Sequence, residues 1–235
     1  MTIKGVLFDF SGTLLRIETT ESWLRAVLAE AGTVLPEPEF RRCAQELEYV
    51  GALPGGTPSP RVPDHLRDIW AVRDESADNH RIAYTGLSGV VDLPHPGLHD
   101  ALYNRHMTPP AWGPYPDTAA VLAGLRERGI RVGVLSNIGW DLRPVFREHG
   151  LDQYVDTYVL SYEHGIQKPD PRLFGIALEQ LGVAPEDALM VGDDRHADGG
   201  AAQLGCAVHF VDHLPAHERP GQLLPVLGLV DGSAG

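Results

Sequence analysis

The chain has 235 residues, of which 43% are hydrophobic and 22% are charged, and its formal net charge is −13 at pH 7. This composition is typical of a soluble globular protein that buries a sizeable core. A general nucleic-acid surface needs clustered lysine and arginine, so the acidic balance argues against a nucleic-acid partner.

The cysteine content and the N-terminus bear on the cellular compartment. Cys43 and Cys206 are far apart and lack CxxC spacing. We therefore expect neither a disulfide framework nor a cysteine-rich zinc site, and a reducing cytoplasm fits best. The N-terminus leads directly into an apolar strand rather than into a signal peptide. Because no apolar run reaches the roughly 18 residues of a membrane helix, we expect a cytoplasmic protein without a membrane partner.

Alternating strands and helices dominate most of the chain. Apolar runs that end in polar residues predict five strands, at 3–9, 131–136, 157–161, 188–193 and 207–212. Between them, three segments predict helices that each end at a glycine: 117–128, 170–181 and 198–204. This alternation predicts an α/β fold with a Rossmann-like parallel sheet and helices on both of its faces.

The alternation stops between residues 16 and 114. Helices are predicted there near 21–31, 39–50, 65–72, 76–85 and 97–104, with a proline- and glycine-rich loop at 54–60. We interpret a helical block that follows the first strand of an α/β core as a lid. The prediction is an α/β core formed by residues 1–15 and 115–235 and an inserted α-helical cap domain formed by residues 16–114.

Two motifs at strand ends combine an acid with hydrogen-bond donors. Asp9 ends the first strand and is followed by the turn 11–13, Ser-Gly-Thr. A carboxylate at the carboxyl end of a buried strand is costly to desolvate unless a cation or donors meet it, and ligands bind at that edge of such sheets. Ser136 and Asn137 end another strand and can donate to an anion. Taken singly, these motifs also fit a simple turn and a helix cap.

The other two motifs supply a fixed cation and an acid cluster. Lys168 precedes Pro169, whose ring restricts the preceding backbone, so a rigidly held positive charge is expected. Asp193 and Asp194 end a further strand, and Asp198 follows. Neighbouring carboxylates repel one another unless a cation lies between them, and hard oxygen ligands favour Mg²⁺. Taken singly, the lysine is also consistent with an ordinary solvent-exposed side chain, and the acids are consistent with caps of the next helix.

Together, the order acid, hydroxyl, lysine and acid pair resembles the haloacid dehalogenase superfamily, in particular its members with a helical cap after the first strand. The resemblance implies a hydrolase for a small anionic substrate, active as a monomer or homodimer. It implies that Asp9 forms a covalent aspartyl intermediate and that Ser136, Asn137 and Lys168 bind the transferring phosphoryl group. The Mg²⁺ ligands that it implies are Asp9, the backbone carbonyl of Ser11, Asp193, and Asp194 or Asp198 directly or through water.

Ser11 departs from the family pattern, because phosphatases of the family carry a second aspartate there as general acid and base. Losing such a group costs about 10²–10⁴-fold in rate. The favoured interpretation is still a Mg²⁺-dependent phosphatase whose substrate has a good leaving group, or in which a cap residue or His196 activates water. A 2-haloacid dehalogenase is an alternative, because a halide leaves unprotonated, although that branch replaces the acid pair. A weakly active protein that binds a phosphorylated ligand or a partner is a third.

Two further groups of side chains lie outside these four motifs. Three histidines repeat at four-residue intervals, but the first lies in a predicted strand, so a zinc site at His209, His213 and His217 is not expected. Arginines in the predicted cap are mostly solvated. One or two of them are expected to point into the cleft, and the sequence does not show which: Arg41, Arg42, Arg73 or Arg81.

Overall fold

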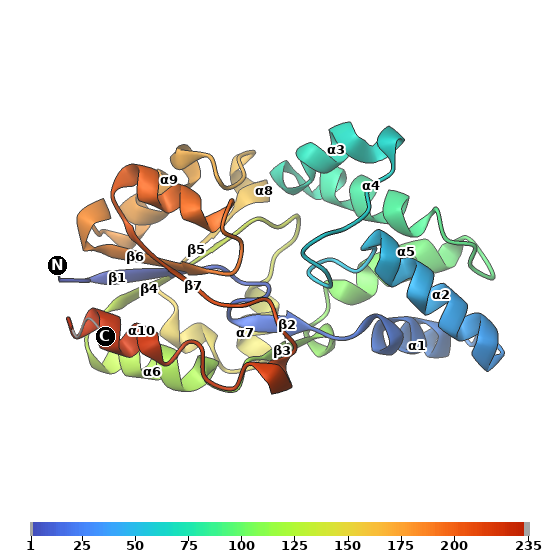
Figure 1. Cartoon of the computed structure of the whole chain (residues 1–235), viewed down its shortest axis with the longest axis horizontal. Coiled ribbons are helices and arrows are strands. Elements are labelled where there is room, and N and C mark those ends of the chain that lie inside the picture. The colour runs from blue at the N-terminus through green and yellow to red at the C-terminus, as the bar shows by residue number, and fades with distance from the viewer. Residues whose placement is uncertain (1, 233–235) are drawn as a thin grey trace.

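Five parallel strands form the centre of the molecule in a computed structural model that describes residues 2–232 (Figure 1). Phe8, the last residue of the central strand, lies opposite Val134 on one side and Val191 on the other. The carboxyl ends of these strands therefore lie along one edge, and the predicted α/β fold is confirmed. The strands are, across the sheet, β5 (Thr157–Leu160), β4 (Arg131–Ser136), β1 (Gly5–Phe8), β6 (Ala188–Gly192) and β7 (Ala207–Phe210).

Helices cover both faces of the sheet because successive strand residues point in opposite directions. In β1, Val6 and Phe8 pack into the core on one face, and Leu7 packs into the core on the other. The first face is covered by α6 (Thr118–Glu127), α7 (Arg143–Glu148) and α10 (Pro225–Val230). The second is covered by α9 (Pro171–Leu181) and a 3₁₀ helix, Asp198–Leu204.

The ends of α9 show how local sequence sets an element beside the site. Asp170 caps the helix by accepting a hydrogen bond from the backbone N–H of Arg172, and Pro171 occupies the first turn. Gly182 ends the helix in the left-handed conformation. By contrast, the segment 198–204 forms a 3₁₀ helix rather than the predicted α-helix. It contains two adjacent glycines, and glycine has a low propensity for the interior of an α-helix. A short helix, α8 (Ser161–His164), follows β5 directly.

Five α-helices separate β2 from β3 along the chain and lie beyond the carboxyl edge of the sheet (Figure 1). The predicted helix at 65–72 is divided into a 3₁₀ turn and a short α-helix. The helices are α1 (Thr20–Glu30), α2 (Glu37–Val50), α3 (Arg67–Ala71), α4 (Ala77–Ser88) and α5 (Gly97–His106). Within residues 2–232, no helix combines the length and apolar character needed to cross a membrane.

Two short strands join this helical layer to the rest of the chain. β2 (Leu15–Ile17) pairs antiparallel with β3 (Trp112–Pro114). The sequence analysis did not predict them, because each spans only three residues. They fall at the proposed boundaries between core and cap, and the division of the chain into those two domains stays a prediction.

Candidate active site

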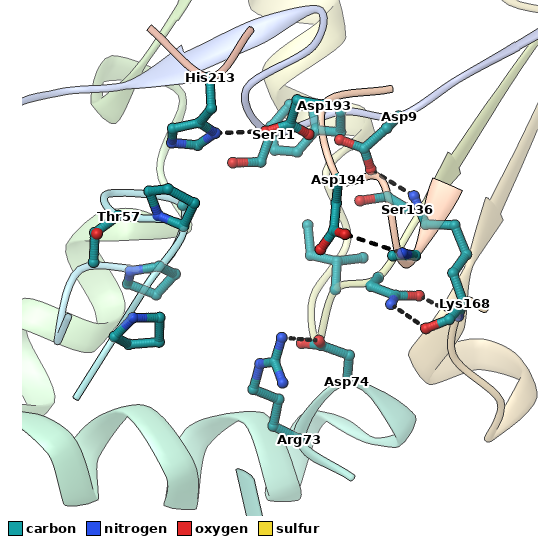
Figure 2. A pocket seen from close by; sticks show the side chains of 18 of the residues that line it. Asp9, Ser11, Thr57, Arg73, Asp74, Ser136, Lys168, Asp193, Asp194 and His213 are labelled. Carbon is teal, nitrogen blue, oxygen red and sulfur yellow. Dashed lines mark hydrogen bonds and ion pairs between the residues drawn. The ribbon is translucent and has the colours of Figure 1, made fainter. Parts of the chain in front are cut away.

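A cavity of about 420 Å³ lies between the carboxyl edge of the sheet and the helical layer. Figure 2 shows acidic side chains and Lys168 on the side of the sheet, and Arg73 and Asp74 on the side of the helices. The motifs at four separate places in the sequence therefore meet at one cavity, as the strand-end argument expects. The predicted site residues that line it are Asp9, Ser11, Ser136, Asn137, Lys168, Asp193, Asp194 and Asp198.

Lys168 lies between two buried carboxylates. Its Nζ is 2.8 Å from Asp9 Oδ1 and 2.6 Å from Asp198 Oδ1. Burial disfavours the charged form of the lysine, but Asp198 and Asp9 outweigh that effect and raise the pKa of Lys168. Burial raises the pKa of Asp9 to about 8 even though the ammonium group opposes this shift. Additional positive charge near Asp9 would lower its pKa and favour the ionised carboxylate.

Asn137 fixes the backbone that carries this lysine. Its Oδ1 accepts from the Lys168 N–H at 2.7 Å, and its Nδ2 donates to the Lys168 carbonyl at 2.9 Å. Ser136, the preceding residue, ends β4 and is buried at the cavity. Both polar atoms of the Asn137 amide are thus engaged with Lys168. Binding of a phosphoryl group by Ser136 and Asn137 stays a prediction.

A third carboxylate, Asp193, completes a compact oxygen cluster with Asp9 and Asp198. One ligand oxygen from each of the three lies within 4.8 Å of the others. The Thr13 hydroxyl lies 3.3 Å from Asp9 Oδ2 and 3.4 Å from Asp193 Oδ1. Three acids beside one ammonium group can all ionise only if more positive charge is present, which a divalent cation would supply. A donor set made only of oxygens fits Mg²⁺.

Asp194 does not belong to this cluster. Its Oδ1 accepts hydrogen bonds from the backbone N–H groups of His196, at 2.8 Å, and Ala197, at 3.0 Å. The carboxylate thus caps the turn that leads into the next helix. His196 is exposed and is not among the residues that line the cavity, so this structure does not bring it to the reacting groups.

His213 is a cavity residue that the sequence analysis did not assign to the site. Its Nδ1 lies 2.5 Å from Asp193 Oδ2. Both pack against Gly12, where an added Cβ would lie 2.3 Å from either of these atoms. With a φ of 81°, this position favours glycine for its backbone as well. His213 follows β7, so the strand-end argument applied to that strand would have indicated it.

A loop from the helical layer covers Ser11. The Ser11 Oγ is buried and has no hydrogen-bond partner among the described residues. A Cβ added at Gly55 would lie 2.3 Å from that oxygen. Arg16 holds the loop in place by donating to the carbonyls of Gly55 and Gly56. The loop therefore occupies the space beside Asp9 into which a longer side chain at position 11 would extend.

One of the four arginines considered for the cleft, Arg73, lines the cavity. It lies in a short 3₁₀ helix, Arg73–Glu75, between α3 and α4. The other three form exposed or half-exposed ion pairs outside the cavity lining: Arg41 with Glu37, Arg42 with Glu46, and Arg81 with Asp100.

Residues 3–205 match the family of haloacid dehalogenase-like hydrolases. The chain belongs to this family. Its five-stranded parallel sheet agrees with that membership, and the chain is accordingly a hydrolase.

Relatives of this haloacid dehalogenase-like (HAD-like) hydrolase include both phosphatases and dehalogenases. It is 34% identical over 216 residues to a glyceraldehyde 3-phosphate phosphatase of Methanopyrus kandleri, covering 86% of this chain and 81% of the relative. It is 34% identical over 210 residues to (S)-2-haloacid dehalogenase 4A of Burkholderia cepacia, covering 87% and 80%. A phosphoserine phosphatase of Thermus thermophilus is 45% identical over 108 residues, which is 45% of this chain and only 43% of that protein.

Solved structures show the same two classes. A HAD phosphatase from Thermococcus onnurineus is similar with a TM-score of 0.57 and 26% identity, covering 89% of this chain and 86% of that one. L-2-haloacid dehalogenase from Xanthobacter autotrophicus is similar with a TM-score of 0.57 and 25% identity, covering 99% and 85%. The reaction must therefore be argued from the site itself.

Proposed function

We propose that this HAD-like hydrolase is a Mg²⁺-dependent phosphatase for a small phosphorylated metabolite, with Asp9 as its nucleophile. The observation that carries the proposal is the cluster of Asp9, Asp193 and Asp198 around a single ammonium group. A halide leaves without electrophilic assistance, so carbon–halogen hydrolysis does not call for such an acid cluster. A cytoplasmic location and a monomeric or homodimeric state stay predictions.

Attack by Asp9 on a phosphate dianion requires that charge repulsion be offset. When bound, Mg²⁺ would supply positive charge against both the cluster and the phosphoryl group, held by Asp9, the Ser11 carbonyl and Asp193, with Asp198 directly or through water. Lys168 adds a fixed ammonium group on the other side of Asp9. The close grouping of acids in the cavity supports a site in which both Mg²⁺ and Lys168 supply positive charge.

The chain's own residues would act in two steps. The Asp9 carboxylate attacks phosphorus, the bond from phosphorus to the leaving oxygen breaks, and the leaving group departs with its electron pair. Lys168 and the Ser136 hydroxyl donate hydrogen bonds to the phosphoryl oxygens. Water then attacks the phosphorus of the aspartyl phosphate, Asp9 departs as a carboxylate, and the proton of water passes to solvent.

Ser11 restricts the substrates that such a site can turn over. A hydroxyl cannot protonate a leaving oxygen near neutral pH as a carboxylic acid can, and a missing general acid costs about 10²–10⁴-fold. We therefore propose acyl or aryl phosphates, whose leaving groups need no protonation, as the preferred class. Alkyl phosphate esters are expected to be poor substrates.

A 2-haloacid dehalogenase is the second candidate. Ser11 favours it, because this reaction needs no acid at that position, and dehalogenases are among the relatives that cover most of the chain. In that reaction Asp9 would displace the halide from carbon and form an ester, which water would then hydrolyse. Asp193 and Asp198, the other two members of the acid cluster, have no role in these steps.

One set of assays separates the candidates. Phosphate release from acetyl phosphate and 4-nitrophenyl phosphate is measured with Mg²⁺ and after chelation, and halide release is measured from both enantiomers of 2-chloropropionate. We expect Mg²⁺-dependent phosphate release that Asp9→Asn and Asp193→Asn abolish, while Asp68→Asn, at an exposed position outside the cavity, leaves it unchanged. Full activity without metal, or release of halide instead, would overturn the proposal. No turnover together with tight binding of a phosphorylated ligand would favour a binding protein.

A further inference from the structure

Arg73 presents a rigidly held positive charge on the wall of the cavity that faces the catalytic carboxylates (Figure 2). Its guanidinium lies 4.3 Å from the centroid of the Trp70 ring, and its Nη1 donates to the Trp70 carbonyl at 2.9 Å. Its Nη2 lies 3.3 Å from Asp74 Oδ2. Stacking and these polar contacts fix the group in place, so little side-chain entropy remains to be lost when it binds a ligand.

The guanidinium keeps donors that the described residues do not use. It has five N–H donors, and the contacts with the Trp70 carbonyl and Asp74 each engage one terminal nitrogen. Its Nε is buried and has no hydrogen-bond partner among those residues. The Arg73 side chain is 27% exposed, whereas that of its partner Asp74 is 5% exposed. Of this pair, the arginine is therefore the side chain more accessible to a ligand in the cavity. Asp194 faces Arg73 across the cavity, but no ion pair joins them and the Asp194 carboxylate is engaged with backbone amides.

We propose that Arg73 forms an anion subsite that receives a carboxylate of the substrate, at the end remote from the phosphoryl group. This inference rests on the phosphatase function proposed above and specifies its substrate as a phosphorylated carboxylic acid. Trp70 and Trp140 line the cavity and give apolar walls for the body that joins the two acidic ends, while the hydroxyl of Tyr84, a third cavity residue, interacts with Arg73.

The charge of the cavity favours a carboxylate over a second phosphate at Arg73. Five carboxylates line the cavity, namely those of Asp9, Asp74, Asp193, Asp194 and Asp198. A monoanion meets less repulsion from them than a dianion does. The planar guanidinium also matches the two oxygens of a carboxylate, which it can bind through parallel hydrogen bonds.

Two matched probes test the subsite. In 4-carboxyphenyl phosphate and 4-carbamoylphenyl phosphate the remote groups have nearly the same shape and differ in charge. The quantity measured is the ratio of their kcat/KM values in the presence of Mg²⁺. Because both substrates are compared on the same preparation, the ratio does not depend on the fraction of protein that is folded.

In the wild-type protein, kcat/KM is expected to be about 10-fold or more higher for the carboxylate probe, because a charge-assisted hydrogen bond contributes a free energy of that size. Arg73→Gln is expected to abolish the preference, and Arg73→Lys to restore part of it. Since Arg73→Gln leaves the buried Asp74 without its partner, the double variant Arg73→Gln/Asp74→Asn is measured as well and is expected to show no preference. Arg81→Gln, the same substitution in an arginine outside the cavity lining, is expected to keep the wild-type ratio.

Several results would overturn the inference. Equal kcat/KM values for the two probes in the wild type, or a preference that survives Arg73→Gln, would exclude Arg73 as the receiving group. A preference lost only in Arg195→Gln would assign the anion to the other cavity-lining arginine. Turnover of both probes without a preference leaves the phosphatase function standing, whereas turnover of neither overturns that function and this inference together.

Discussion

His213 Nδ1 lies 2.5 Å from Asp193 Oδ2, while the Thr13 hydroxyl lies 3.4 Å from the other oxygen of the same carboxylate. Asp193 is thus held from two sides in the acid cluster. Groups that hold a metal ligand in place reduce the free energy needed to organise the site when the ion binds. We therefore expect His213 to act on the proposed metal site through Asp193.

The first prediction is that His213→Ala weakens Mg²⁺ binding about 10–100-fold, the usual effect of removing a group that orients a ligand. Titration calorimetry of the metal-free protein measures the affinity directly, without any assay of turnover. His217→Ala is the matched control, because the His217 side chain is 80% exposed. Unchanged affinity in His213→Ala would show that this contact does not support the metal site.

Metal binding is also expected to depend on pH through Asp9. Burial raises the pKa of Asp9 from an ordinary value near 4 to about 8, which favours the protonated form of this group in the metal-free protein at pH 7. A cation favours the carboxylate, and its binding must therefore release a proton at pH 7. The affinity for Mg²⁺ is predicted to rise as the pH rises towards about 8 and then to level off. Calorimetry in two buffers of different ionisation enthalpy measures the released proton, and Asp9→Asn should reduce that release.

Acid is expected to destabilise the helical layer through two buried histidines. Burial lowers the pKa of His106 to about 3 and that of His80 well below its ordinary value. In the unfolded chain both would bind protons near pH 6.5, so this contribution to stability is fully present above that pH and is lost as the pH falls towards 3. His106 costs up to about 1.4 kcal/mol per pH unit in that window, and the lowered pKa of His80 acts in the same direction.

Comparison of the wild-type protein with His106→Phe isolates the effect of His106 on the pH dependence of the free energy of unfolding. The raised pKa values of Asp9, Asp74 and Asp198 act in the opposite direction on acidification, but they are common to both proteins. The free energy of unfolding, from urea titrations at pH 7.5 and pH 5, should fall less steeply in the variant. A fall of the same size in both proteins would contradict the assignment to His106.

Ser11→Asp would supply the general acid and base that the resemblance to phosphatases of the family implies at this position. Hydrolysis of an alkyl phosphate is predicted to rise by about 10²-fold, the lower end of the usual range, because Gly55 crowds the Ser11 side chain. Acyl phosphates, which leave unprotonated, should gain much less. Ser11→Asn introduces the same bulk without an acid and serves as the control. An equal rate in the wild type and Ser11→Asp would mean that acid catalysis is not what limits the reaction.

Strand ends explain how much of the site could be predicted from the sequence. In a parallel sheet the carboxyl ends of the strands lie on one edge, so Asp9, Ser136 and Asp193 could be placed together without a structure. Lys168 could be added because the following proline and helix start fix its backbone. These inferences need only local patterns and the topology of alternating strands and helices.

The remaining features depend on contacts between distant segments. The packing of Gly55 against Ser11 is set by how the helical layer lies on the core, and no local pattern encodes it. The positions of Arg41, Arg42 and Arg81 outside the cavity lining and the cavity position of Arg73 follow from helix orientations in the same way. His213 was tested only as part of a helical zinc motif, although it follows a strand whose end faces the cavity.

The central claim is that Asp9 becomes phosphorylated in a Mg²⁺-dependent reaction, and mass spectrometry of the acid-quenched protein tests it most directly. The protein is mixed with acetyl phosphate with and without Mg²⁺, quenched during turnover, digested and analysed. We predict one phosphoryl group on the peptide that contains Asp9, present only with Mg²⁺ and absent from Asp9→Asn. Phosphorylation that does not require the metal, or a propionyl ester on Asp9 after reaction with 2-chloropropionate in place of any phosphoryl adduct, would contradict the account.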